Sequence, residues 1–224
     1  LTKTLKEISS QPKVKVLIIS SEGPGFSAGH DLDELRKNKN NKEFFKLLFN
    51  ECSKLMQTIM NLPQPVIAEV SGIAAAAGCQ LVASCDLAIA SEQSSFMTPG
   101  VNIGLFCSTP MVAVSRNISR KKIMEMLLTG EKLNSQDAVQ FGLINHSVPQ
   151  EQLCNKTMDL AKLIASKPSS TVKIGKEAFY RQVEMPINEA YNYTSEVMTA
   201  NMMELDAQEG INAFLDKRHP NWNE

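Results

Sequence analysis

The sequence has no excess of either charge and no long hydrophobic run. Its 224 residues include 23 Lys and Arg against 24 Asp and Glu, which leaves a net charge of −1. Nucleic-acid-binding domains usually carry a surplus of Lys and Arg, and proteins held at anionic membranes carry a basic cluster. The apolar run 73–79 ends at Gln80, well short of the roughly 18 residues that cross a bilayer. We therefore expect neither nucleic-acid binding nor membrane insertion.

The cysteines also lack a pattern. There are five, scattered along the chain, and no two have the C-x-x-C spacing of zinc sites and redox motifs. They are Cys52, Cys79, Cys85, Cys107 and Cys154. Free thiols in apolar surroundings are typical of proteins from a reducing compartment. No metal site is expected.

What the sequence does contain is an alternation of strand-like and helix-like segments over its first 149 residues. Short β-branched runs are typical of buried strands, and apolar residues at helical spacing are typical of amphipathic helices. The expected strands are 14–19, 66–70, 87–90 and 143–148, and the expected helices are 43–60, 74–84, 111–117, 121–128 and 135–141. This alternation favours an α/β fold with a parallel sheet and right-handed crossovers.

The remainder of the chain shows helical patterns only. The expected helices are 150–166, 171–182, 186–203 and 207–216. We therefore divide the chain into a core, residues 1–149, and a C-terminal helical region, residues 150–224. This region is rich in Met and has apolar faces, so we expect it to pack over the sheet or against another subunit.

Two stretches, 25–32 and 70–80, place small residues where a strand gives way to a helix. Backbone N–H groups at the start of a helix are unpaired and lie at the positive end of its dipole. Two such turns side by side can direct two donors at one oxygen, as an oxyanion hole requires. Close packing of a helix on a sheet needs small residues as well. The pattern alone leaves both interpretations open.

Several ordered segments match the motifs of one known family. Residues 26–32 match F-x-A-G-x-D-[IL], and residues 65–72 with the Ala-rich stretch that follows match P-[VI]-I-A-x-V-x-G-x-A-x-G-G-G. Residues 84–90, 96–105 and 128–148 match a C-D-[IL]-x-[IV]-A strand, an F-x-x-P-E-x-x-x-G segment and an L-T-G-x-x-x-x-A-x-x-x-G-L-[IV] stretch. Residues 208–220 match a C-terminal E-G-x-x-A-F-x-x-K-R-x-P. The chain thus resembles the crotonase superfamily, the enoyl-CoA hydratase/isomerase family, and one subgroup of it also shares 78–86 and 98–102.

The resemblance implies a crotonase-like spiral of ββα repeats followed by a C-terminal helical trimerisation region. It implies a homotrimer or a dimer of trimers. The implied ligand is an acyl-CoA thioester, with coenzyme A as part of the substrate and no separate cofactor. It also implies a role in mitochondrial fatty-acid and lipid metabolism. A βαβ portion of the family is expected to be missing ahead of Leu1, which is not an initiator Met.

Carried onto this sequence, the family's oxyanion hole falls on the backbone N–H groups of His30 and Ala77. Removing one such donor typically costs about 3 kcal/mol of barrier lowering. The CoA moiety is expected at Phe26, Ser27, Ala28, Asp31 and Leu32, with Lys217 and Arg218 near its phosphates. Alternatives are a general-base role for the imidazole of His30 and an ordinary solvated chain end for the two basic residues.

Two positions depart from the family's pattern. Its hydratases use two glutamates to position and activate water, and this sequence has Gln80 and Gly100 at those positions. A glutamine can orient water but cannot take its proton, and a glycine can do neither. We therefore do not expect ordinary enoyl-CoA hydration. Cys107 lies where other members place alternative acids, although a buried thiol without a neighbouring base is usually inert.

Two classes of function stay open. One is an enzyme that acts on an acyl-CoA thioester without the two glutamates, as an isomerase, hydrolase or decarboxylase. The other is an acyl-CoA-binding or regulatory protein without turnover. A titratable side chain facing the acyl carbon would separate them, and the candidates are Glu69, Asp86, Glu92 and Cys107. A serine peptidase is not expected, because no Ser/His/Asp set lies at the required turns.

Overall fold

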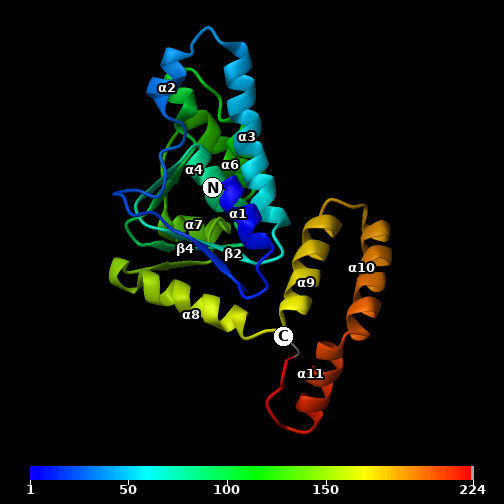
Figure 1. Cartoon of the computed structure of the whole chain (residues 1–224). Helices are drawn as coiled ribbons and strands as arrows, with labels where there is room; N and C mark the ends of the chain where they lie inside the picture. The colour runs from blue at the N-terminus through cyan, green and yellow to red at the C-terminus, as the bar shows by residue number, and fades with distance from the viewer. Residues whose placement is uncertain (223–224) are drawn as a thin grey trace.

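Two small sheets form the centre of the molecule (Figure 1), which the computed structural model describes over residues 1–222. The four-stranded sheet has the order β1-β2-β4-β7 and is parallel throughout. Its strands are Leu17–Ile19, Val66–Val70, Leu87–Ser91 and His146–Val148. The second sheet has the order β3-β5-β6, with Ile73–Ala75 parallel to Ser95–Met97 and Leu133–Asn134 antiparallel.

Each turn of the chain places one strand in each sheet and then enters a helix. Strands β2 and β3 lead into α4 (Ala77–Ser84). Strands β4 and β5 lead into the 3-10 helix η1 (Pro99–Ile103) and α5 (Ser108–Val114). This is the ββα repeat that the family resemblance implies, and the α/β class is confirmed.

The remaining core helices lie around the two sheets. They are α1 (Thr2–Ser9), α2 (Leu32–Lys37), α3 (Lys42–Asn61), α6 (Arg120–Thr129) and α7 (Ser135–Phe141). Local chemistry sets the bounds of α7, because the side chain of Asn134 accepts from the backbone N–H of Asp137 and Gly142 ends the helix in the left-handed conformation. Helix α3 buries Met56 and Ile59 and ends just before Pro63.

The sequence pattern missed the short strands of the second sheet. Strand β3 occupies residues 73–75, where a helix from 74 onward is expected, and β5 and β6 have three and two residues. Alternation of side chains cannot be recognised over so few positions. The first strand is shorter than expected. Residues 14–16 fit the strand pattern in the sequence, but they pair with no neighbouring strand.

The C-terminal region is helical, as predicted. It comprises η2 (Gln150–Gln152), α8 (Leu153–Ala165), α9 (Ser169–Gln182), α10 (Ile187–Met202) and α11 (Leu205–Leu215). Helix α8 packs against β1, β2 and β4, whereas α9, α10 and α11 stand beside the core as a lobe of their own (Figure 1). Because α8 packs with the core, the structure does not separate two regions at residue 150. The division there stays a prediction.

A buried ion pair fastens α9 to the core. The Lys176 Nζ lies 2.7 Å from the Asp86 Oδ2 and also donates to the backbone carbonyls of Ile59 and Gln64, at 3.1 and 3.0 Å. The hydroxyl of Tyr180 donates to the other oxygen of Asp86 at 2.9 Å. Since these contacts join α9 to the end of α3 and the start of β4, they fix the position of the whole helix.

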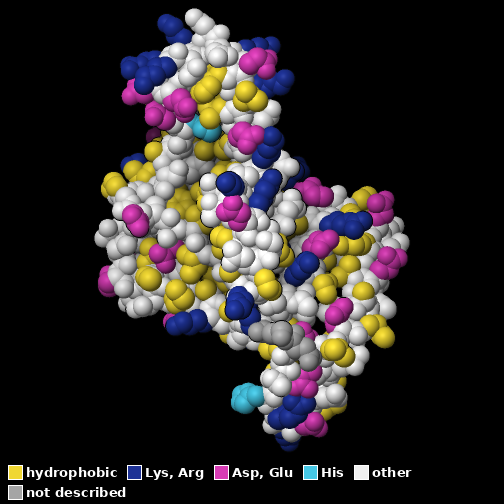
Figure 2. Space-filling view, in the orientation of Figure 1, with side chains coloured by type: hydrophobic (Ala, Val, Ile, Leu, Met, Phe, Trp, Pro, Cys, Tyr) yellow, Lys and Arg dark blue, Asp and Glu magenta, His cyan; other side chains and the backbone are white. Residues whose placement is uncertain are grey.

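The α9–α11 lobe leaves large apolar side chains exposed. Those more than half exposed are Phe179, Val183, Ile187, Tyr191, Met198, Met203, Leu205, Phe214 and Leu215. Figure 2 shows hydrophobic patches over this lobe on the side in view. Within the described residues, no helix has both the length and the apolar character needed to cross a bilayer.

Candidate functional site

The two small-residue turns singled out in the sequence lie side by side. The backbone N–H of Ser27 donates to the carbonyl of Ile73 at 3.0 Å, and the N–H of Ala75 donates to the carbonyl of Ser27 at 2.8 Å. A side chain at Gly29 would lie 3.3 Å from the backbone nitrogen of Ala77, and its φ of 95° favours glycine there. The residue after Gly29, His30, therefore adjoins the start of α4.

A sharp turn presents the N–H of Ala77. Ala76 precedes the helix with φ 48° and ψ −113°, a conformation that residues other than glycine rarely adopt, and its own N–H donates to the carbonyl of Met97 at 3.0 Å. Within residues 1–222, neither the His30 N–H nor the Ala77 N–H donates a hydrogen bond. The structure thus brings together two backbone donors, one of them at a helix N-terminus.

The close packing of α4 also brings the two backbone N–H groups to adjoining turns. A side chain at Gly78, in the first turn of α4, would collide with the backbone carbonyl of Ser27. Glycine at this position lets α4 approach the neighbouring turn closely enough to place the two N–H groups together. The close packing is therefore observed, and the oxyanion hole stays a prediction.

The imidazole of His30 is half-buried and packs edge-on against Phe49, with ring centroids 5.6 Å apart. Burial lowers the pKa of this imidazole, and the nearby carboxylate of Glu34 opposes that effect. Burial therefore favours the uncharged ring. The backbone N–H of His30 is the group that follows Gly29 at the turn beside Ala77.

The residues expected to contact CoA differ in their exposure and in their hydrogen bonds. Phe26 is 8% exposed and belongs to the core, and the hydroxyl oxygen of Ser27 accepts the N–H of Gly29. The carboxylate of Asp31 caps α2 by accepting from two backbone N–H groups, at 2.8 and 3.3 Å. Ala28 and Leu32 are exposed. A ligand along this turn would thus meet mainly backbone, Ala28 and Leu32.

The two basic residues of the tail are not brought to this turn. They follow α11, which lies at the opposite end of the molecule from α2 (Figure 1). The guanidinium of Arg218 donates to both carboxylate oxygens of Glu209, at 2.7 and 2.9 Å, and Lys217 is exposed with φ 55°. Their contact with CoA phosphates stays a prediction, and it requires a second subunit.

Gly100 occupies a closed position. Its N–H donates to the sulfur of Cys107 at 3.4 Å. A side-chain carbon added at Gly100 would lie 2.7 Å from the carbonyl oxygen of Leu105 and 2.9 Å from that sulfur. Burial raises the pKa of the Cys107 thiol, so it is protonated at neutral pH and a poor nucleophile.

Gln80 lines a cavity of about 810 Å³ that the sequence did not predict. It is open to solvent and is lined mainly by helices α3, α4, α5 and α9, with Met56, Met60, Gln80, Val112, Phe179 and Val183 among its walls. Gln80 is 4% exposed and lies one turn after Ala77 on nearly the same face of α4. The helical spacing over 43–60 predicted the helix that forms one wall of this cavity, but it did not indicate the cavity itself.

Two of the four titratable candidates from the sequence make hydrogen bonds inside the protein. Asp86 is bound to Lys176 and Tyr180, and Cys107 to the N–H of Gly100. Glu69 is half-buried on β2 and Glu92 is exposed after β4. Among residues 1–222, no group of three or more His, Cys, Asp or Glu is arranged to hold a metal ion.

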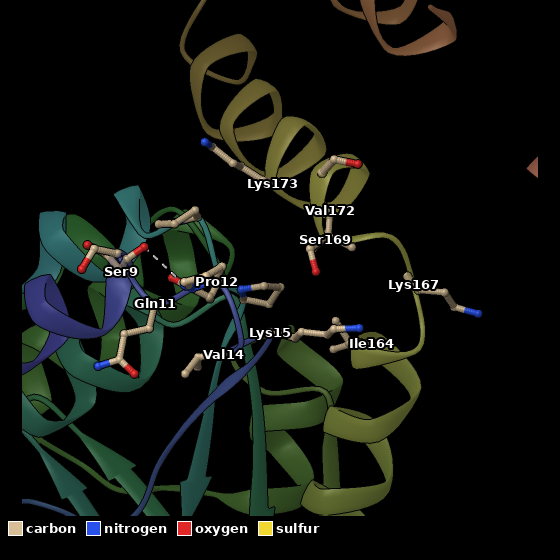
Figure 3. A pocket seen from close by; sticks show the side chains of 15 residues that line it. Ser9, Gln11, Pro12, Val14, Lys15, Ile164, Lys167, Ser169, Val172 and Lys173 are labelled. Carbon is tan, nitrogen blue, oxygen red and sulfur yellow. Dashed lines mark hydrogen bonds between the residues drawn. The ribbon is translucent and has the colours of Figure 1, made fainter. Parts of the chain in front are cut away.

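A second cavity, of about 310 Å³, lies between the segment that follows α1 and the junction of α8 with α9 (Figure 3). Lys167 points away from it, and Lys15 extends beside Ile164 and donates to the carbonyl of Ala165 at 3.2 Å. Its walls include neither of the two turns, so it is separate from the candidate site.

Comparison with known proteins agrees with this geometry. A family described as enoyl-CoA hydratase/isomerase matches residues 1–224. The chain is 52% identical over 210 residues to human enoyl-CoA hydratase domain-containing protein 3, mitochondrial, covering 94% of this chain and 69% of that protein.

Solved structures of related proteins share the same fold. An enoyl-CoA hydratase from Mycobacterium smegmatis superposes with a TM-score of 0.96 at 44% identity, over 99% of this chain and 86% of that one. The crystal structure of the human domain-containing protein 3 gives 0.92 at 49%, over 99% and 90%. The crotonase fold is confirmed, as is the subgroup indicated by residues 78–86 and 98–102.

Proposed function

The chain belongs to the enoyl-CoA hydratase/isomerase family, and on this premise we propose that it binds acyl-CoA thioesters through the backbone N–H groups of His30 and Ala77. One observation carries the proposal: these two N–H groups lie at adjoining turns and are unpaired within residues 1–222. A carbonyl oxygen between them accepts both hydrogen bonds.

The chemistry follows from the geometry of the two donors. Negative charge that develops on the thioester oxygen is stabilised by N–H groups already oriented toward it, at about 3 kcal/mol for each donor. The dipole of α4 adds to this effect at Ala77. Coenzyme A is part of the ligand, and the proposed reaction needs no further cofactor.

The names of the relatives indicate a cellular compartment. Human enoyl-CoA hydratase domain-containing protein 3 is described as mitochondrial. We propose the same compartment for this protein and a role in fatty-acid metabolism.

Hydration of an enoyl-CoA is expected to be weak, because Gln80 and Gly100 supply no base. A positioned general acid or base contributes about 10²–10⁴-fold in rate. The enolate that the oxyanion hole stabilises remains accessible, which leaves isomerase, hydrolase and decarboxylase chemistry as options for an active enzyme.

A second candidate is an acyl-CoA-binding protein without turnover. The observation in its favour is that two of the candidate acids, Asp86 and Cys107, are engaged in internal contacts. The two candidates share the binding site and differ in whether any product forms.

Binding is tested by titration calorimetry with butyryl-CoA and crotonyl-CoA, with free coenzyme A for comparison. Both thioesters should bind more tightly than free coenzyme A, because the latter has no carbonyl for the two N–H groups. If neither thioester binds, the proposed function is wrong.

Turnover is tested by following crotonyl-CoA hydration in the parent and in Gln80→Glu. The parent should hydrate slowly, and Gln80→Glu should raise the rate by about 10²-fold by restoring one base. Gln57→Glu makes the same chemical change on the cavity wall contributed by α3 and should leave the rate unchanged. Brisk hydration by the parent would contradict the assigned roles of Gln80 and Gly100.

Glutamate at position 100 is not a matched test. The carbonyl of Leu105 and the sulfur of Cys107 occupy the space that its side chain would need. Gly100→Glu therefore has to displace the 100–107 segment, and a loss of activity would report that displacement rather than the chemistry.

A further inference from the structure

The cavity of about 310 Å³ beside the junction of α8 with α9 has basic and hydroxyl-bearing walls (Figure 3). Among the described residues that line it there is no Asp or Glu. Its polar wall residues are Ser9, Ser10, Gln11, Lys15, Gln64, Lys167, Ser169, Ser170 and Lys173. The volume is near the lower limit for small-molecule sites, so a ligand here has to be compact. The surplus of basic side chains favours a ligand with negative charge.

The start of α9 adds backbone donors to these walls. Pro168 precedes the helix, and no side chain caps it. Within residues 1–222, the backbone N–H groups of Ser169 and Ser170 donate no hydrogen bond. The side chain of Ser169 points from the helix toward Lys15, across the cavity (Figure 3). Unpaired N–H groups at the positive end of a helix dipole bind anions.

The charged groups nearby are compatible with an anion at this point. Lys173 follows Ser169 by one turn on α9 and lines the same cavity. Lys15 brings a second ammonium group to the cavity, where it donates to the carbonyl of Ala165 at 3.2 Å. The carboxylate of Asp206 accepts the hydroxyl of Ser170 at 2.9 Å and is not part of the walls.

A buried amide independently indicates a ligand in this cavity. Gln64 lines it, is 7% exposed, and has an Oε1 atom without a hydrogen-bond partner. Its Nε2 lies 3.4 and 3.5 Å from the carbonyl oxygens of Ile8 and Ser9, so the amide group belongs to the wall at the end of α1. These two acceptors identify the unpaired atom as the oxygen. A buried acceptor without a partner is costly, and a donor on a ligand would remove that cost.

The two walls therefore need different groups on one ligand. The start of α9 and the lysines need an anion, and the Oε1 of Gln64 needs an O–H or N–H donor. A phosphate monoester carries a charge of about −1.5 to −2 at pH 7 and three acceptor oxygens. A hydroxyl group elsewhere on the same molecule supplies the donor.

We propose that this cavity binds a small phosphate monoester that carries a hydroxyl group, with the phosphate at the start of α9 and the hydroxyl at Gln64. The inference goes beyond the proposed function, since the walls include neither His30 nor Ala77. Because the walls come both from the segment after α1 and from α9, the ligand connects the core to the α9–α11 lobe.

The test compares glycerol 3-phosphate with propyl phosphate, which share a three-carbon chain and differ in their hydroxyl groups. Titration calorimetry of the whole chain should show glycerol 3-phosphate binding about fivefold more tightly, as one added hydrogen bond to a neutral acceptor predicts. Glycerol, which has no phosphate, should not bind. Saturation with butyryl-CoA should leave both phosphate affinities unchanged, because the two sites are separate.

Variants on the two walls separate the roles of the phosphate and the hydroxyl. Gln64→Leu removes the acceptor and should abolish the preference while propyl phosphate still binds. Ser169→Asp places a negative charge beside the phosphate and should weaken both ligands by about tenfold, although an acid in the first turn suits the helix itself. Ser108→Asp makes the same change at the first residue of α5, outside the cavity, and should match the parent.

Failure of glycerol 3-phosphate to bind the parent at millimolar concentration would overturn the inference. Equal affinity of the parent for the two phosphates, or full binding in Ser169→Asp, would overturn it as well. Phosphate binding that disappears in the presence of butyryl-CoA would place the phosphate at the thioester site and likewise contradict it. None of these results affects the proposed function, which depends on thioester binding alone.

Discussion

At the scale of single residues, two glycines in helices have opposite surroundings. A side chain at Gly78 would collide with the backbone of Ser27, whereas at Gly175, in α9, nothing lies within 4 Å. The first glycine is required by the close approach of two segments, and the second is an ordinary weak point in an exposed helix.

Alanine at each position should therefore have effects of opposite sign. We expect Gly78→Ala to destabilise the fold by about 1–3 kcal/mol, because the neighbouring turn must move, and to weaken thioester binding. Gly175→Ala should stabilise by about 1 kcal/mol through its helix propensity. Urea denaturation measures both, and equal effects at the two positions would contradict the packing described for Gly78.

The sequence predicted the small residues of the site but not everything that surrounds them. The motifs placed His30 and Ala77 at paired turns because the family resemblance carries that information. Nothing in the sequence indicated that Cys107 would fill the space beside Gly100, or that Cys52 would contact Gln80. These contacts join segments far apart in the chain, and spacing within one segment does not report them.

At the scale of elements, α9 depends on the buried pair of Lys176 and Asp86. The two side chains are 7% and 15% exposed, so removing one of them leaves an unpaired charge with little access to water. Lys176→Met should destabilise the protein by about 3–5 kcal/mol in chemical denaturation.

An exposed pair near the same helix provides the control. Arg116 and Glu184 lie 2.9 Å apart with side chains 52% and 60% exposed. Glu184→Gln should cost less than about 1 kcal/mol. A similar loss in both variants would show that burial does not determine the strength of the Lys176 pair.

The end of the chain is held to α11 by a carboxylate. Glu209 accepts from Arg218 and from the N–H of Asn221, and these hydrogen bonds lower its pKa from 4.5 to about 2. Trp222, the single tryptophan, follows directly and donates to the carbonyl of Ser166 at 3.0 Å. Because the folded pKa is depressed, this contribution is complete above pH 4.5 and is lost as the pH falls through 2.

The fluorescence of Trp222 should therefore shift to longer wavelength as the pH falls over that range. Glu209→Gln should show the shifted emission already at neutral pH, whereas Glu204→Gln, at the N-terminus of α11, should not. Circular dichroism recorded in parallel separates this local release from unfolding. Emission that changes only together with helix content would contradict the prediction.

Secondary structure was predictable in proportion to the length of each element. The boundaries of α3, α7 and β2 follow from helical spacing, an Asn–Gly pair of caps and a β-branched run. Strands β3, β5 and β6 have at most three residues and exist because neighbouring strands pair with them, β3 with β5 in parallel and β5 with β6 antiparallel. That pairing is set by the fold of the entire chain.

At the scale of the whole molecule, the exposed apolar side chains of the α9–α11 lobe favour association. The family resemblance implies a trimer or a dimer of trimers, and sedimentation equilibrium should give about three or six times the chain mass of 24.7 kDa. Replacing Phe214 and Leu215, which are 83% and 70% exposed, with Ser should lower that mass without loss of helix.

Leu47→Ser, at an exposed position of α3, is the matched control and should leave the mass unchanged. A parent protein that sediments as a monomer at micromolar concentration would contradict the prediction.

The bridge between Ser27 and Ala74 has a consequence for the order of folding. It joins segments separated by the whole of α2, α3 and β2. Contacts between distant segments form late, because the intervening loop must close before they contribute any stability. The two N–H groups meet only once this pairing exists. During refolding, affinity for a thioester should therefore appear after most of the helical signal has returned, and a chain that binds its ligand has already joined these two distant segments.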